Sequence, residues 1–524
     1  MLITINYERS PSDDYTTGSI LRSLDRCIIP RFKQKIRVSI RSRPSIDQDL
    51  SEKDLSNDKV HQQQYNHHHN HHGEGAIEEE EEEQQQQQQQ QVVGSVQISD
   101  YDLLDWDVLN DPQNQVLINS YPIRKALIRK NYLIETVKMY EAKRRDRKMV
   151  KISELEGDGD QRVEGSRSEE QSLTTGFLPR SWHFEISFPD ELDELLQDEL
   201  FEVSEALSKQ QDDCSSDDRL FILKPALSDR ADGIRLFDSI EQLYEIFGQI
   251  DEEEEENPTV DEPHTTISQM KHWIIQKYIS NPLLIDPKLS HPFDLSALSN
   301  SSKSLRKHHL RVYVLAVGAL KVYVFKDILS LFSSKPFNLK SKDLSIHITN
   351  TCLNNKLRSL TKTGVDLTPT TMDDTEDDAK DNGLVYLIDQ PSSITDQIDR
   401  ILRSTFLAAT SQPINFQLNS NCFEVFGVDF LIDSDLKVWL LEFNSGPDFN
   451  QSGDKLRSSI DDLFVGVAKI VIEPFLCKTT GTNNDDEGDG DDGRVGLDDW
   501  GVSEERFKFR KIMELDLLAF NNFG

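Results

Sequence analysis

The chain has 524 residues, which is enough for two or three domains with sizeable cores, although only 36% of its residues are hydrophobic. Its 93 acidic residues outnumber its 58 basic residues and leave a formal net charge of −35. This balance excludes nonspecific binding to DNA or RNA, which needs a basic surface, and it restricts an acidic protein tail to a local basic patch.

The five cysteines are odd in number, dispersed and without CxxC spacing. This usage is typical of a reducing compartment and argues against a disulfide framework or a cysteine zinc site. The first ten residues lack the basic flank and long apolar core of a signal peptide, and no uncharged apolar run reaches membrane-spanning length. We therefore expect a cytoplasmic protein with no membrane partner, and association with microtubules or processing bodies stays open.

The amino-terminal part predicts a strand, a helix and a second strand, at 2–7, 13–27 and 36–40. Residues 45–97 then lose all periodicity and contain a histidine tract, six consecutive glutamates and eight consecutive glutamines. A segment of this composition buries too little apolar surface to offset its ordering entropy, so we expect a disordered insert. Metal binding by the histidine tract is the alternative.

The middle of the chain predicts a helix from about residue 123, with apolar residues at helical spacing. Further on, a buried strand ends on Lys224, a loop follows, and a second strand starts at Gly233. This is the geometry of a flap over phosphates, with a lysine placed to neutralise them, although a lone lysine at the end of a strand is more often not a phosphate ligand. The remaining predicted elements are a helix at 239–247, an acidic loop at 251–257, a strand ending at 276–279, and a strand pair within 304–325.

The last third of the chain predicts an amphipathic helix at 394–409, a helix at 458–476 and a short terminal helix at 507–520. Between the first two, the stretch 422–447 has two apolar, β-branched and aromatic runs around the polar centre 433–435. That pattern predicts a β-hairpin with both faces buried.

Three polar residues interrupt the apolar hairpin. If 434–435 is a two-residue turn, residue 432 lies opposite 437, and residue 429 lies opposite 440. Asp429, Glu442 and Asn444 then project from the same face, although a one-residue slip in register would separate them. Clustered oxygen ligands suit Mg²⁺, which one or two carboxylates usually hold together with nucleotide phosphates and water. The alternative is that these acids cap a loop or pair with an arginine.

The segment GVDFLIDSDLKVWLLEFNSGP resembles the carboxy-terminal signature of the tubulin–tyrosine ligase and tubulin-ligase-like family, most of all its fungal branch. With further matches, the resemblance covers most of the chain outside the low-complexity inserts. It implies an α+β fold, namely an ATP-grasp fold with a small α/β amino-terminal domain and low-complexity inserts. It also implies a ligase that joins an amine to a carboxylate with ATP and Mg²⁺ as cofactors.

The same resemblance implies roles for particular residues. The ATP-binding set is Lys130, Lys224, Gln276, Lys277, Tyr278, Ile279, Lys307, His347, Thr349 and Asn350. The catalytic set is Lys224, Arg311 and Glu442, and the metal set is Asp429, Glu442 and Asn444. In the family, the stretch 276–279 is a hinge that meets adenine partly through backbone groups. For Lys130 a solvated helix face is the alternative, and for His347 it is a structural role.

The chain departs from the family pattern at three places. His308 and His309 replace the aromatic residue and the aspartate of a Lys-aromatic-Asp-aliphatic-Arg motif. An imidazole cannot reproduce a carboxylate, because it offers at most one acceptor. Leu331 stands where relatives carry an arginine, which removes a charge-assisted contact of about 1.5–3 kcal/mol. The flap has also lost family glycines and retains only Gly233.

We expect an amino-terminal α/β domain split by the insert, a central ATP-grasp domain and a carboxy-terminal ATP-grasp domain that carries the metal site. The amino-terminal domain is expected at 1–44 and 98–150, with the insert at 45–97. The central domain is expected at 173–300 and the carboxy-terminal domain at 301–477, with an acidic insert at 361–383. An acidic loop at 478–499 and a terminal helix at 500–524 are expected to follow.

By resemblance, the acceptor is the carboxy-terminal glutamate of α-tubulin and the amine is free L-tyrosine, so the expected partners are a tubulin tail and a free amino acid. One alternative is a ligase that adds glutamate or glycine to tubulin. A second is a nucleotide-binding scaffold that has lost catalysis, which His309 and Leu331 favour. Recruitment through the polyglutamine and acidic inserts is compatible with either.

Overall fold

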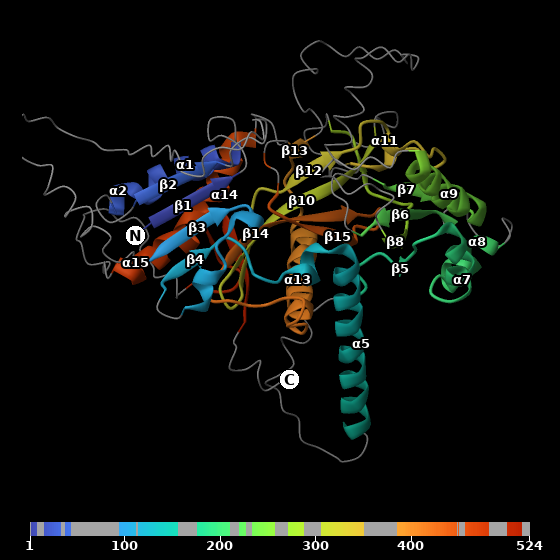
Figure 1. The fold of residues 1–524 in the computed structure, drawn as a ribbon, viewed down its shortest axis with the longest axis horizontal. Helices are drawn as coiled ribbons and strands as arrows, with labels where there is room; N and C mark the ends of the chain where they lie inside the picture. Colours follow the sequence, from blue (N-terminus) through green and yellow to red (C-terminus); the bar gives the residue numbers. More distant parts are fainter. Residues whose placement is uncertain are drawn as a thin grey trace, which may run out of the picture.

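The computed structural model describes residues 2–7, 15–32, 37–42, 94–111, 114–155, 175–209, 219–226, 233–256, 271–287, 305–349, 385–447, 449, 456–480 and 500–515. These residues form three β-sheets with helices packed on their faces, shown in Figure 1. The mixture of helix and sheet confirms the expected α+β class.

The first sheet is parallel, with strand order β2-β1-β3-β4. Its strands are β1 (Leu2–Tyr7), β2 (Arg37–Ser42), β3 (Ser95–Ser99) and β4 (Val116–Ile118). The helices α1 (Tyr15–Cys27) and α2 (Ile29–Phe32) come between β1 and β2. The disordered insert was predicted to extend to residue 97, and this end was wrong because β3 begins at Ser95. Residues 45–93 of the predicted insert lie outside the described residues.

Two short 3-10 helices and two α-helices lead from this sheet to the centre of the molecule. They are η1 (Tyr101–Leu103), η2 (Asp107–Asn110), α4 (Lys125–Ile128) and α5 (Lys130–Leu155). The helix predicted from about residue 123 is therefore confirmed as α4 and α5.

The second sheet is antiparallel, with strand order β5-β8-β6-β7. Its strands are β5 (Ser181–Glu185), β6 (Phe221–Pro225), β7 (Arg235–Phe237) and β8 (His272–Lys277). Helices η3 (Pro189–Glu191), α7 (Leu192–Gln197), α8 (Phe201–Ser208) and α9 (Ile240–Glu256) bury their apolar residues against it. The acidic loop predicted from residue 251 was wrong up to residue 256, because α9 continues through the glutamate run.

The third sheet has nine strands, and β10 (Arg306–Val317) and β14 (Phe423–Ile432) pair along its middle. The other strands are β9 (Leu284–Ile285), β11 (Lys321–Phe325), β12 (Leu329–Phe332), β13 (Val385–Leu387), β15 (Val438–Ser445), β16 (Glu505–Arg506) and β17 (Phe509–Glu514). The terminal helix predicted at 507–520 was wrong, because β17 pairs with β11 there.

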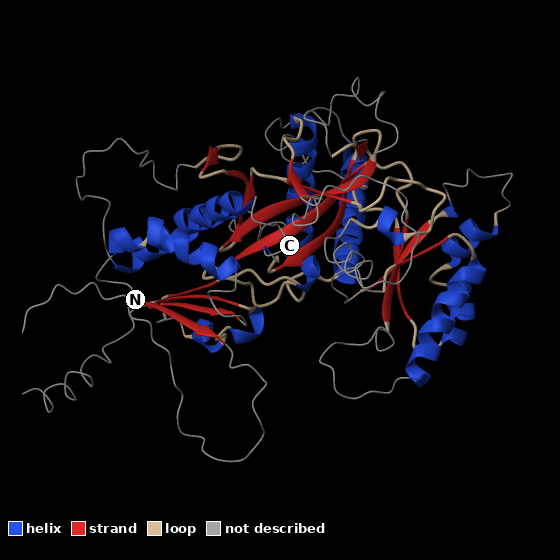
Figure 2. Ribbon diagram, turned by 90° about the horizontal axis from the view of Figure 1, so that it is seen from above, coloured by secondary structure: helices blue, strands red, loops and turns tan. Residues whose placement is uncertain are grey.

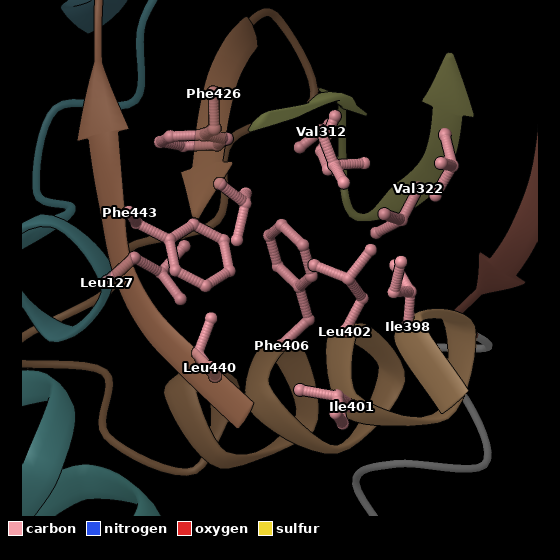
Figure 3. Close-up of a cluster of buried hydrophobic side chains, with 14 of the residues drawn as sticks. Leu127, Val312, Val322, Ile398, Ile401, Leu402, Phe406, Phe426, Leu440 and Phe443 are labelled. Atoms are coloured by element: carbon pink, nitrogen blue, oxygen red, sulfur yellow. The ribbon is translucent and has the colours of Figure 1, made fainter. Parts of the chain in front are cut away.

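Helices cover both faces of the nine-stranded sheet. On one face, α13 (Ser392–Thr410) inserts Ile398, Leu402 and Phe406 among side chains of β10, β14 and β15, as Figure 3 shows. On the other face lie α14 (Arg457–Val467), a π-helical turn (Ala468–Ile472) and α15 (Glu473–Thr480), which share a core with α1 and α2. The sheets and their helical layers are seen from above in Figure 2.

The chain passes directly from the second sheet to the third. After β8, the backbone N–H of Leu283 donates to the carbonyl of Ile432 over 2.8 Å, and β9 then pairs with the start of β10. A short helix, α11 (Leu344–His347), packs near the same place. The start of β6 and the end of β8 are therefore held next to the start of β10 and the end of β14.

Candidate nucleotide and metal site

The hairpin of β14 and β15 contains a bulge that places its polar residues. Ile432 pairs with Val438 rather than with residue 437, and a register shift beyond Phe430 sets Asp429 opposite Glu442. The predicted pairing of 429 with 440 was therefore wrong. Leu440 faces the buried core, and Asp429 and Glu442 share the other face, because the extra residue in β15 shifts the alternation. The predicted shared face of the two carboxylates is confirmed.

Asp429 is 5% exposed and is engaged by two neighbours. Arg311 on β10 donates to both of its oxygens, from Nε over 2.5 Å and from Nη2 over 3.0 Å. The Asn444 amide, on β15, lies 3.3 Å from Asp429 Oδ2. Burial alone would lower the pKa of Arg311, but the Asp429 carboxylate raises it above its ordinary value. Arg311, which the family resemblance placed in the catalytic set, thus neutralises Asp429.

Glu442 forms the second acidic group of the site. Lys130, the first residue of α5, places Nζ 3.3 Å from Glu442 Oε2. Burial alone would raise the pKa of Glu442, but the charges of Lys130, Lys224 and Arg311 lower it to about 2. Glu442 is therefore a carboxylate throughout the physiological range. Lys130 therefore points into the site through its ion pair with Glu442 and does not lie on a solvated face of its helix.

Lys224 reaches the site from β6. Its Nζ donates to the Gln276 side-chain oxygen over 2.8 Å, and the Gln276 amide donates to Ser181 Oγ over 2.9 Å. Burial lowers the pKa of Lys224 to about 8, although the nearby Glu442 carboxylate opposes that shift. This chain of hydrogen bonds from Lys224 through Gln276 to Ser181 holds the lysine where the second sheet meets the third.

Lys307 begins a second hydrogen-bonded row. Its Nζ donates to the Tyr278 hydroxyl over 3.0 Å, and that hydroxyl lies 2.7 Å from His347 Nδ1. Because His347 Nε2 lies 2.5 Å from the carbonyl of Ser341, which can only accept, the neutral ring accepts from Tyr278. Burial, together with a smaller effect of the Lys224 charge, lowers the pKa of Lys307 to about 7. The two lysines therefore belong to one electrostatic cluster.

His309 lies between Lys307 and Arg311 on the site-facing side of β10. Its Nδ1 is 2.5 Å from Thr349 Oγ1, and its Nε2 is 3.7 Å from Asp429 Oδ2. Burial lowers the pKa of His309, against the opposing effect of Asp429, so the ring is neutral at pH 7. Leu331 pairs with His309 on the neighbouring strand β12 and is 7% exposed, packed in the apolar core.

The remaining hinge residues are partly engaged within the protein. The backbone N–H of Lys277 donates to Arg180 over 2.8 Å, and that of Tyr278 donates to Leu220 over 3.0 Å. Ile279 follows them and is partly exposed. Asn350 lies outside the described residues. Among the residues that are described, no three His, Cys, Asp or Glu side chains form a group that could hold a metal ion.

One buried carboxylate was missed at the sequence level. Glu424, at the start of β14, is 3% exposed and faces Arg124 Nε at 2.8 Å. It also accepts from the Tyr121 backbone over 3.2 Å. The signal was present, because Glu424 interrupts the same apolar run as Asp429, but its partner lies 300 residues away.

The fold and the chain as a whole resemble known proteins. The crystal structure of the carboxy-terminal domain of Pby1 from K. lactis, described as an ATP-grasp enzyme that interacts with the mRNA decapping enzyme Dcp2, superposes with a TM-score of 0.51. The match covers 98% of this chain and 99% of that one at 24% identity. The arrangement of sheets is therefore an ATP-grasp fold, as expected. None of the described helices is long and apolar enough to cross a membrane.

The family model named "Tubulin-tyrosine ligase family" matches residues 108–480. A "Probable tubulin--tyrosine ligase" of Schizosaccharomyces pombe is 34% identical over 404 residues, covering 74% of this chain and 85% of the relative. The "Probable tubulin--tyrosine ligase PBY1" of Saccharomyces cerevisiae is 34% identical over 411 residues, and the chain spans about half (47%) of its length. This chain belongs to the tubulin-tyrosine ligase family, as its hairpin motif indicated.

Proposed function

We propose that this chain is an ATP-dependent ligase that joins an amino acid, L-tyrosine in the first instance, to the carboxy-terminal glutamate of α-tubulin. The observation that carries the proposal is the convergence of Asp429 and Glu442 with Lys130, Lys224 and Arg311 where two sheets meet. Such a cluster of opposite charges suits a triphosphate with its cation, and family membership supports a ligase.

The reaction requires a carboxylate to become electrophilic. The γ-phosphoryl group of ATP passes to the acceptor carboxylate and gives an acyl phosphate and ADP; the amine then attacks the carbonyl carbon and releases inorganic phosphate. Lys224 and Lys307 would offset the triphosphate charge, because both keep Nζ at the sheet junction. Tyr278 and His347 would hold Lys307 in place, and the stretch 276–279 would border adenine.

The donor set fits Mg²⁺, since two carboxylates and one amide oxygen are ligands that this ion accepts beside nucleotide phosphates. Asp429, Glu442 and Asn444 would hold it, and Arg311 and Lys130 would give up contacts to the carboxylates. When bound, the ion supplies charge stabilisation for phosphoryl transfer. Lys130 and Arg311 would then be free to meet phosphate or the acidic acceptor.

The test is a ligase assay on purified protein with ATP, tubulin and labelled tyrosine, glutamate or glycine. Wild type should incorporate tyrosine, and Glu442→Gln should lose about 100-fold or more of that activity. Glu505→Gln, an exposed surface change on β16, is the matched control and should leave activity unchanged. Incorporation of glutamate or glycine in place of tyrosine would reassign the substrate.

A glutamylase or glycylase is the nearest rival. The chain is 27% identical over 261 residues (45% of its length) to a "Probable beta-tubulin polyglutamylase" and 25% identical over 279 residues (50% of its length) to "Tubulin glycylase 3C", both from Tetrahymena thermophila. A catalytically impaired scaffold is favoured by one observation, the bidentate Arg311–Asp429 pair that occupies a metal ligand. ADP release that does not depend on both amino acid and tubulin tail would support the scaffold.

We also propose cytoplasmic association with processing bodies, supported by the description of K. lactis Pby1 as a partner of Dcp2. The insert is the segment that could recruit the protein to these bodies. To test this, residues 45–93 are deleted, which spares β3, and the localisation and the ligase activity of the shortened protein are compared with those of wild type. Loss of localisation with retained activity would assign recruitment to the insert. Unchanged localisation would contradict that role.

A further inference from the structure

We infer that His309 is a direct ligand of the cation in this site and shifts its preference from Mg²⁺ toward Mn²⁺. The inference rests on the proposed function, because it takes the nucleotide site as given, and it adds a nitrogen ligand to a set of oxygen ligands.

The first observation is a ring nitrogen without a partner. His309 is 6% exposed, and its Nε2 is fully buried with no hydrogen-bond partner. A buried polar atom left unpaired costs about 1–3 kcal/mol, so such an atom in a candidate active site calls for a ligand. The atom it faces is Asp429 Oδ2 at 3.7 Å, which is too far for a hydrogen bond.

The second observation is how the ring is held. Its Nδ1 contacts the Thr349 hydroxyl at 2.5 Å. If Nδ1 donates that hydrogen bond, Nε2 carries the lone pair and points it toward Asp429. Metal-binding histidines characteristically use one ring nitrogen for a hydrogen bond that fixes the tautomer and the other for the metal. Thr349 would supply that orienting contact.

The third observation concerns what separates Nε2 and Oδ2. In the tautomer with the proton on Nδ1, the Nε2 lone pair faces a carboxylate oxygen, and a cation between the two atoms would remove their mutual repulsion. Two atoms that each lie about 2.1 Å from one cation are at most about 4.2 Å apart, so a span of 3.7 Å is compatible with a shared ion. Arg311 and Lys130 hold the two carboxylates, which accounts for the lack of a preformed ligand group among the described side chains.

The identity of the metal follows from ligand chemistry. Carboxylate and amide oxygens suit Mg²⁺ and Mn²⁺ alike, whereas imidazole favours the first-row transition metals over Mg²⁺. Mn²⁺ accepts both ligand types. A site with Asp429, Glu442 and His309 should therefore select Mn²⁺ more strongly than a site with oxygen ligands alone.

The experiment measures Mn²⁺ bound with ATP by electron spin echo envelope modulation, a readout independent of turnover. The full-length protein is prepared with natural-abundance histidine and with ¹⁵N-histidine. We expect ¹⁴N modulation of a bound imidazole, replaced by ¹⁵N modulation in the labelled protein. This arm needs no variant, so it stands even if a substitution prevents folding.

The variant arm uses His309→Asp, with His183→Asn as a matched control because His183 is 42% exposed on β5. His309→Asp should lose the imidazole signal and lower the ratio of Mn²⁺ to Mg²⁺ affinity about 10-fold or more. The control should keep both. Mn²⁺ bound with ATP but without a histidine signal would overturn the inference and leave the proposed function intact. No binding of Mn²⁺ or Mg²⁺ with ATP would overturn both.

Discussion

Two lysines of the site, the buried Lys307 and the partly buried Lys224, carry charges that the protein removes from water. Lys307 is 9% exposed, and its direct partner is the neutral Tyr278 hydroxyl, with the ring of Tyr278 4.4 Å from its Nζ. Removing a charge from water is unfavourable, which is why burial lowers the pKa of both lysines, in the case of Lys224 against the opposing effect of the Glu442 carboxylate. A bound triphosphate would offset this cost, so the free protein sacrifices stability for the ability to bind an anion.

Substituting one lysine should reveal that trade. Lys307→Met keeps the apolar stem and removes the charge, so the free protein should gain about 1–3 kcal/mol of unfolding free energy at pH 7 while nucleotide binding is lost. Chemical denaturation and binding of a non-hydrolysable ATP analogue measure the two effects. Lys326→Met, at a lysine with 61% side-chain exposure, is the control and should change neither. A destabilised Lys307→Met protein would contradict the argument.

The same lysines predict a dependence of stability on pH. Their pKa values are about 7 and about 8 in the folded protein, below the value near 10.4 of an unfolded lysine. Between those values the unfolded chain binds more protons than the folded one, so the unfolding free energy of the free protein should rise from pH 7 to pH 10. Denaturation at several pH values measures this rise. Saturating ATP with metal should abolish it, since bound phosphates keep the lysines charged.

At the scale of elements, the pairing of β10 with β14 brings Arg311 to Asp429, and Gly427 leaves room for it. A Cβ on Gly427 would lie 3.1 Å from Arg311 Cδ and 3.2 Å from Pro447 Cβ. Glycine within a strand often marks such a close approach. The small residue at 427 therefore helps to determine where the guanidinium stands.

Gly427→Ala should push Arg311 away from Asp429 and destabilise the protein by about 1–3 kcal/mol, as overpacking typically does. ATP binding should also change, because Asp429 loses its neutralising partner. Gly248→Ala is the control: it lies in α9, its Cβ would contact nothing within 4 Å, and it should stabilise by about 0.5–1 kcal/mol. Equal unfolding free energies for Gly427→Ala and wild type would refute the packing argument.

The hairpin also shows what sequence reasoning can reach. Its two apolar, β-branched and aromatic runs predicted both strands. The shared face of Asp429 and Glu442 was predicted from a register without a bulge, and it is found because the one-residue difference in register and the one-residue bulge compensate each other. The register was wrong, since the bulge opposite Asp429 and Phe430 depends on packing that no local pattern encodes. Likewise 509–514 forms a strand because β11 offers a free edge, a tertiary effect that the helix-like spacing of its apolar residues concealed.

The lysines illustrate a further limit. Lys224, Lys307 and Lys130 come from three separate elements, and only the family resemblance suggested that they meet. The hydrogen-bonded rows through Gln276 and through Tyr278 show how they are held. Nothing in the spacing of these residues along the chain contains that information.

At the scale of the whole molecule, the amino-terminal sheet and the nine-stranded sheet contribute side chains to one hydrophobic core. The Ile118 backbone N–H donates to Asn421 over 2.9 Å, and α1 packs against α14. Between these contacts lies a cavity of about 440 Å³, lined in part by Ser99, Arg124 and Glu424. Among the described ion pairs of this junction, both side chains are buried deep inside the protein only in Arg124–Glu424. The Arg22–Asp461 pair is exposed.

Arg124→Met should therefore be severe. It leaves Glu424 buried without its cation, and breaking one side of such a pair costs about 3–5 kcal/mol. Burial already raises the pKa of Glu424 to about 7, so the variant should be least stable above pH 7, where the carboxylate must ionise, and should recover partly at pH 5. Adding Glu424→Gln removes the unpaired charge and should restore most of the lost stability.

The control is Arg22→Met, at a 47% exposed side chain, which should cost under about 1 kcal/mol. Denaturation of these four proteins at pH 5 and pH 8 measures the coupling between the sheets; equal losses for Arg124→Met and Arg22→Met would show that the buried pair does not hold them together.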